Sequence, residues 1–162
     1  MDATGERSGG KSVWDLLLGL QLGVIGGILM LAWTSLVSPL VGHPWWLIPN
    51  LLASYFYSNR ELYFGPGIVT VVGVAVQIFT SGVVGSVAGV ATPGGRLSGI
   101  GMAAVWYLFC LLFLWKRVAP MMLLAPVQPI LWTGYFIFGS TLGWHRHLRG
   151  RMIAYSSSVT HP

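Results

Sequence analysis

Three glutamines and a tryptophan lie deep inside long apolar stretches, where amides and indoles can form hydrogen bonds. Gln21, Gln77 and Gln128 fall in three such stretches and Trp106 in another. Counted at about 1.5 Å per helical residue, all four lie near the middle of a bilayer. Hydrogen bonds between helices contribute about 1 kcal/mol or less each. We therefore expect a mid-membrane polar layer that satisfies itself, with a polar ligand, pigment, quinone or lipid site in that layer as the alternative.

A second chemical motif stands at the N-terminus. Residues 5–12, GERSGGKS, match the phosphate-binding pattern G-x-x-x-x-G-K-[ST]. That pattern works when a strand precedes it and a helix follows, so that backbone N–H groups converge on phosphate. Only four residues precede the match and an apolar stretch follows it. We interpret it as a chance match in a polar tail.

The remaining nucleophilic and metal-ligating residues are scattered. His145 and His147 are two positions apart, so on a helix they point to different faces, and with the neighbouring arginines they indicate a headgroup-binding basic cap. His43 is interpreted as a hydrogen-bonding loop residue and Cys110 as a small packing residue. We expect no catalytic residues, no metal site and no cofactor of the chain's own, with a bound lipid or pigment as the alternative.

Four apolar stretches must position these residues. Hydrophobic residues make up 54% of the chain and charged residues 8%. A helix needs about 20 apolar residues to cross a bilayer. The sequence predicts an all-α integral membrane protein with four transmembrane helices and polar tails at 1–12 and 144–162. The predicted helices cover residues 13–37, 67–91, 97–115 and 119–143.

Basic residues indicate the orientation of these helices. One side holds Arg7, Lys11, Arg96, Arg146, Arg149 and Arg151, and the other holds Arg60, Lys116 and Arg117. Lys and Arg accumulate on the cytoplasmic side. We expect a multi-pass protein of the bacterial inner membrane with both termini in the cytoplasm. The +5 net charge is explained by these flanking residues, and no nucleic-acid partner is expected.

Small residues recur every four positions in the apolar stretches. In lipid, helices associate by close backbone approach, which small residues permit. We therefore expect the small residues to be the packing faces. They are Gly19, Gly23 and Gly27 in the first helix, Ser81, Gly85 and Gly89 in the second, and Gly139 and Gly143 in the last.

The connection over residues 38–66 is long and aromatic. Prolines interrupt its start, and Asn50 is a plausible N-cap for a short helix over LLASYFYSNREL. This helix is too short to span and is expected to lie in the membrane interface. An ordinary loop packed on the bundle and a contact surface for partners are both compatible with it. The expected contact residues are Trp45, Trp46, Tyr55, Tyr57 and Tyr63.

Motifs along residues 19–143 resemble an uncharacterised family of small four-helix bacterial inner-membrane proteins. They are GLQLGVIGGILM, then Trp46 with Pro49, Asn50, Leu51, Leu52 and Ala53, then the S-x-x-x-G-x-x-x-G of the second helix, and GYFIFGSTLG. In that family a histidine often stands at the positions of Gln77 and Tyr135. The resemblance implies the four-helix fold and implies no activity.

Three function classes remain. The first is a non-catalytic accessory subunit of a larger respiratory or photosynthetic inner-membrane complex, with other membrane subunits and lipids as partners. The second is a small oligomeric transporter or channel, which the glutamine layer supports. A lipid-modifying enzyme is the least favoured, because the sequence offers no nucleophile–base pair.

Overall fold

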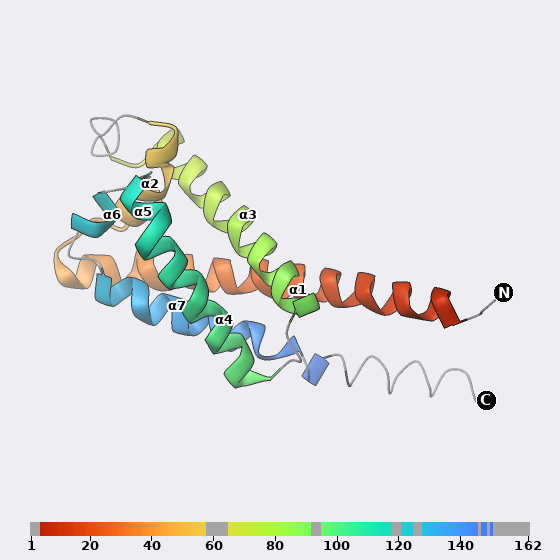
Figure 1. The fold of residues 1–162 in the computed structure, drawn as a ribbon. Coiled ribbons are helices and arrows are strands. Elements are labelled where there is room, and N and C mark those ends of the chain that lie inside the picture. Colours follow the sequence, from red (N-terminus) through yellow and green to blue (C-terminus); the bar gives the residue numbers. More distant parts are fainter. Residues whose placement is uncertain are drawn as a thin grey trace, which may run out of the picture.

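The chain folds into helices throughout its described part. The computed structural model describes residues 4–57, 65–91, 95–117, 121–124, 128–145, 147–148 and 150, without the side chains of residues 4–12, 55, 121 and 124. Every regular element in these ranges is helical, which confirms the all-α prediction (Figure 1). Among the described residues, three helices are long and apolar enough to cross a membrane, at Val13–Val41, Ile68–Ala91 and Arg96–Arg117.

The first helix, α1 (Thr4–Val37), begins earlier than position 13, where the sequence predicted the first span to start. No proline interrupts residues 4–12, and a helical glycine costs only about 1 kcal/mol relative to alanine. The helix passes into a 3-10 turn, η1 (Ser38–Val41), and ends at Gly42 with a φ of 82°. Glycine adopts this left-handed conformation without steric cost. The N-terminal part of α1 projects beyond the other helices (Figure 1).

The short helix after α1 differs from the predicted interfacial helix. Helix α2 (Leu47–Leu52) begins three residues before Asn50, and it continues into η2 (Ala53–Tyr55). Asn50 is buried within α2 and does not cap it. The α2 helix packs on α3 (Ile68–Ala91), and a Cβ on Gly73 of α3 would overlap the backbone oxygen of Pro49. Helix α2 is therefore part of the core.

Asn50 connects α2 to the start of α3 by hydrogen bonds. Its Nδ2 donates to the backbone oxygen of Gly65 at 3.1 Å, and its Oδ1 accepts from Thr70 Oγ1 at 2.6 Å. The backbone N–H of Gly67 donates to the same Thr70 hydroxyl at 3.2 Å. Because both side chains are buried, these bonds satisfy groups that water cannot reach.

The third predicted span is one continuous helical segment with an irregular turn. It comprises α4 (Arg96–Phe109), a π-helical turn η4 (Cys110–Leu114) and α5 (Trp115–Arg117). Its bounds lie within two residues of the predicted 97–115. The π-turn was not predicted, because no residue type marks it in the sequence.

The predicted fourth span over 119–143 is not a single helix in the described residues. Helix α6 (Met121–Leu124) and helix α7 (Gln128–Leu142) are separated by residues 125–127, which lie outside the description. At about 1.5 Å per residue, the 15 residues of α7 cover about 22 Å, less than a hydrocarbon core of about 30 Å. Pro129 occupies the first turn of α7, where its missing N–H removes no helical hydrogen bond.

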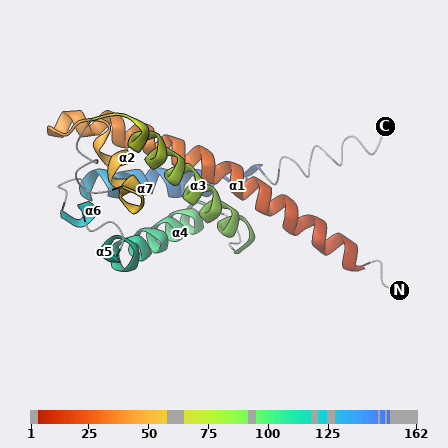
Figure 2. The same ribbon diagram turned by 90° about the horizontal axis from the view of Figure 1, so that it is seen from above.

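Helix α1 is the centre of the bundle. It packs against α3 on one side and α7 on the other, and α7 in turn packs against α4, whereas α3 and α4 contact each other sparsely. Figures 1 and 2 show α7 between α1 and α4. The helices therefore form a bundle that is open between α3 and α4.

Small residues bring the packed helices into backbone contact. A Cβ on Gly19 or Gly23 of α1 would overlap a backbone oxygen of α3, and a Cβ on Gly99 of α4 would overlap the backbone of α7. The predicted packing residues at these contacts are Gly19, Gly23, Gly27, Ser81, Gly85 and Gly89 between α1 and α3, and Gly139 and Gly143 between α7 and α4. Sequence reasoning missed Gly26, which faces Phe138 and Thr141 of α7.

Candidate binding groove between α3 and α4

Gln77 points into the bundle from the middle of α3. Its side chain is buried, and its Nε2 donates to Met30 Sδ of α1 at 3.4 Å and to Ser81 Oγ at 3.2 Å. Gln77, Ser81 and Gly85 are spaced by four residues, so they share the face that packs on α1. The amide therefore links α3 to α1.

Gln128 is bonded at a different place. At the start of α7, its Oε1 accepts from Tyr107 Oη of α4 at 2.6 Å, and its Nε2 donates to the backbone oxygen of Met122 at 3.0 Å. Tyr107 is buried and packs edge-on against Trp115 and Tyr135. Sequence reasoning missed Tyr107, although its four-residue spacing from Ala103 places it on the packing face of α4.

The other two members of the expected layer do not join these contacts. Gln21 is exposed on the outside of α1, so its predicted place in the polar layer is wrong. Trp106 is half-buried and stacks on Phe109, with ring centroids 5.3 Å apart. Gln77 and Gln128 thus make two separate hydrogen-bonded contacts. The amide of Gln21 is exposed, and the indole of Trp106 is stacked on Phe109.

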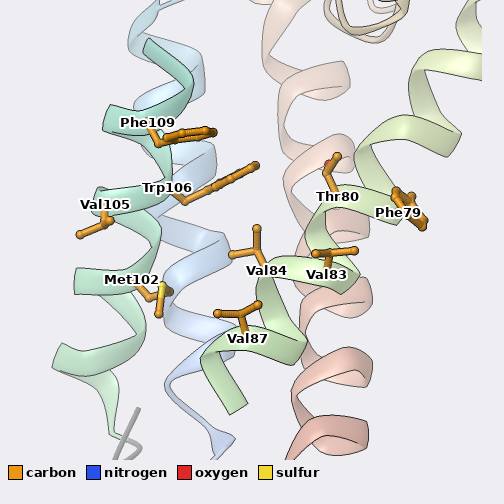
Figure 3. A pocket seen from close by; sticks show the side chains of 9 residues that line it. All are labelled: Phe79, Thr80, Val83, Val84, Val87, Met102, Val105, Trp106 and Phe109. Atoms are coloured by element: carbon orange, nitrogen blue, oxygen red, sulfur yellow. The ribbon is translucent and has the colours of Figure 1, made fainter. Parts of the chain in front are cut away.

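The space between α3 and α4 forms an apolar groove along the side of the bundle. Trp106 and Phe109 point from α4 across the gap toward α3, as Figure 3 shows. The cavity here has a volume of about 360 Å³. Its lining comprises Phe79, Thr80, Val83, Val84 and Val87 of α3, and Met102, Val105, Trp106 and Phe109 of α4. Thr80 alone among these side chains carries a hydroxyl, and that hydroxyl donates to backbone oxygens of its own helix.

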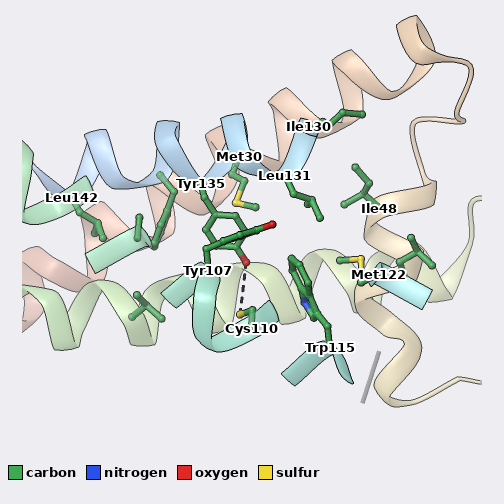
Figure 4. Close-up of a cluster of buried hydrophobic side chains, with 14 of the residues drawn as sticks. Met30, Ile48, Tyr107, Cys110, Trp115, Met122, Ile130, Leu131, Tyr135 and Leu142 are labelled. Carbon is green, nitrogen blue, oxygen red and sulfur yellow. Dashed lines mark hydrogen bonds between the residues drawn. The ribbon is translucent and has the colours of Figure 1, made fainter. Parts of the chain in front are cut away.

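The groove widens toward the end of the bundle that carries α2. A second cavity of about 580 Å³ shares Phe79, Thr80 and Trp106 with the first and extends to Leu52 and Phe56. Its inner wall includes Gln77, Tyr135 and the π-turn residue Cys110. Figure 4 shows Tyr135 reaching across from α7 to Cys110, where its hydroxyl donates to Sγ at 3.8 Å. The two cavities together follow α3 from Val72 to Val87.

The predicted partner-contact residues are distributed over several environments. Trp45 is exposed and Trp46 is half-buried. Tyr57 is half-buried and packs against the hydrophobic core. The side chain of Tyr55 and the whole of Tyr63 lie outside the described residues. The structure therefore leaves Trp45 as the most accessible aromatic residue of this set that it describes.

The histidines near the end of α7 do not share one surface. His145 is buried, and its Nε2 lies 3.9 Å from Asp15 Oδ1 of α1, whereas His147 is exposed. Arg146 and Arg149 lie outside the described residues. The prediction of a headgroup-binding cap is therefore wrong for His145, which packs between α1 and the end of α7.

Comparison of the chain with protein-family models, with curated proteins and with solved structures gave no significant match. The resemblance to small four-helix bacterial membrane proteins stays a prediction.

Proposed function

We propose that this chain is a non-catalytic accessory subunit of a larger inner-membrane assembly, and that a transmembrane helix of another subunit occupies the groove between α3 and α4. The observation that carries the proposal is the open side of the bundle. The α1–α3 and α4–α7 contacts are closed by backbone approach at glycines, whereas α3 and α4 diverge around an apolar groove. A partner helix in this groove would pack against α3 on one side and against α4 on the other.

The length and shape of the groove favour a helix as its occupant. The first cavity follows α3 from Phe79 to Val87, about 12 Å or a little over two helical turns, and the partner helix is proposed for this part of the groove. Its buried residue Val84 and the more exposed Val83 and Val87 carry small β-branched side chains, whereas Trp106 and Phe109 of α4 are aromatic. Since helices in lipid associate mainly through dispersion contacts, such a graded surface suits another helix.

Photocrosslinking from the groove tests the proposal. We expect a photoreactive benzoylphenylalanine at Val87, in native membranes, to crosslink to a membrane-spanning segment of another protein identified by mass spectrometry. Ile25 on α1 is the matched control position, because it is 50% exposed against 54% for Val87 and lies outside both cavities. Crosslinks from Val87 to lipid alone would contradict the proposal.

A bulky side chain in the groove should also release the subunit. We expect Val87→Trp to reduce the fraction of the chain in the larger assembly about tenfold on native gels, since overpacking costs about 1–3 kcal/mol. Ile25→Trp should leave the assembly intact. Equal assembly of both variants would count against the groove as the contact, and selective flux or turnover by the purified chain in liposomes would count against a non-catalytic subunit.

The proposed topology has four crossings, with α6 and α7 together forming the fourth, and both termini in the cytoplasm. The distribution of Lys and Arg supports it. Reporter fusions at Ser12, Gly94 and the C-terminus should report the cytoplasm, and one at Asn59 the opposite side. An external C-terminus together with a cytoplasmic Ser12 would show an odd number of crossings, and an external C-terminus in any case would contradict this topology.

A further inference from the structure

The α2 end of the groove differs from the rest because it contains a buried polar side chain. Gln77 is 7% exposed and lines the wider cavity together with Tyr135 and Cys110. The charged residues of the described part of the chain are absent from this lining. Any occupant that meets this wall must therefore be neutral and mostly apolar.

One polar atom of the Gln77 amide is left without a partner. Nε2 makes both side-chain hydrogen bonds, to Met30 and Ser81, and within the described residues no hydrogen bond reaches Oε1. If the amide is turned over, Oε1 can accept from the Ser81 hydroxyl and Nε2 becomes the unpaired atom. The fully buried side-chain atoms without a partner in the described residues are Ser54 Oγ and His145 Nε2, so the unpaired atom of Gln77 keeps some accessible surface. A group that bonds to it there gains about 0.5–1.5 kcal/mol.

The helix that faces Gln77 across the cavity is distorted at the same place. Cys110 and Leu114 are the first and last residues of the π-turn, and both line the cavity. Isolated π-turns inside α-helices occur frequently at functional sites. The π-turn therefore points to the same part of the groove as the unpaired amide atom does.

We infer that this end of the groove is a binding site for a neutral apolar molecule that carries a hydroxyl group, such as a long-chain alcohol or a quinol. The hydroxyl bonds to the Gln77 amide, and it fits either orientation of that amide because it both donates and accepts. The apolar body lies against Val76, Phe79 and Trp106. This inference does not depend on the partner helix, which is proposed for the Val87 end of the groove.

A pair of photoreactive probes tests the site. The purified chain in lipid nanodiscs is labelled with diazirine-bearing hexadecanol or with diazirine-bearing hexadecane, which lacks the hydroxyl, and the labelled residues are mapped by mass spectrometry. We expect the alcohol to label residues 110–115 about five- to tenfold more than the alkane does, as one net hydrogen bond of about 1–1.5 kcal/mol requires.

Two variants and a control complete the experiment. Gln77→Leu keeps the size of the side chain and should reduce alcohol labelling to the alkane level. Ala75→Trp fills the cavity from an exposed position on α3 and should abolish labelling by both probes, whereas Ile25→Trp should change neither. Equal labelling by the two probes in the unmodified chain, or alcohol labelling that survives Ala75→Trp, would overturn the site. Gln77→Leu should leave the Val87 crosslink unchanged, so failure here is distinguishable from failure of the proposed function.

Discussion

Gly85→Leu should destabilise the bundle by forcing α1 and α3 apart. A Cβ at Gly85 would overlap the backbone oxygen of Gly19 and lie 2.6 Å from the Cα of Gly23. Both are backbone atoms of α1, so no side-chain rotation can relieve the overlap and the helices must separate. We expect a loss of at least about 3 kcal/mol in the free energy of unfolding, measured by denaturant titration in detergent micelles. Gly23→Leu should act alike, because it meets the same contact from α1.

Gly101→Leu is the matched control. Gly101 lies in α4 and is exposed, and a Cβ there meets no atom within 4 Å. The same substitution should therefore be neutral or slightly stabilising, because leucine has the higher helix propensity. If Gly85→Leu and Gly101→Leu unfold alike, the α1–α3 contact is not what holds the bundle together.

Asn50→Leu is expected to have the second-largest effect. Leucine nearly matches asparagine in size but removes the bonds to Gly65 and Thr70, which join α2 to the start of α3. Each buried group left unpaired costs about 1–3 kcal/mol, so we expect a loss of about 2–4 kcal/mol in the free energy of unfolding. Proteolysis at the α2 end of the bundle should also become faster.

A double-mutant cycle isolates the bond between the two side chains. Thr70→Val removes the hydroxyl that donates to Asn50 Oδ1 at 2.6 Å. When Asn50→Leu is already present, Thr70→Val should lower the free energy of unfolding by about 0.5–3 kcal/mol less than it does in the unmodified chain. Strictly additive losses would mean that the two side chains stabilise the fold independently.

Much of the helix packing could be predicted from the sequence, because small residues at four-residue spacing fall on one helix face. The same geometry would have corrected the prediction that Gln21 joins the polar layer. It is two residues, and therefore about 200°, away from both Gly19 and Gly23, so it must face away from α3. The prediction used its depth in the membrane and ignored its angle. Gln77, four residues before Ser81, satisfies both criteria and points inward.

Other features had no signal in the sequence. The burial of α2 depends on the contact between Pro49 and Gly73, which are far apart along the chain. The divergence of α3 and α4 is set by the packing of α3 on α1 and of α4 on α7, and no local pattern encodes it. The two cavities and their polar end were therefore visible only in the structure.

The place of α1 in the bundle has a consequence for biosynthesis. This helix is the first of the described helices to leave the ribosome. One of its two packing faces contacts α7, which is the last of them to be made. Until α7 enters the membrane, Gly26 has no Phe138 to pack against and Asp15 has no His145 nearby. Helix α1 therefore completes its packing only after α7 has been made, and a chain that stops after α4 would lack this contact and leave that face of α1 uncovered.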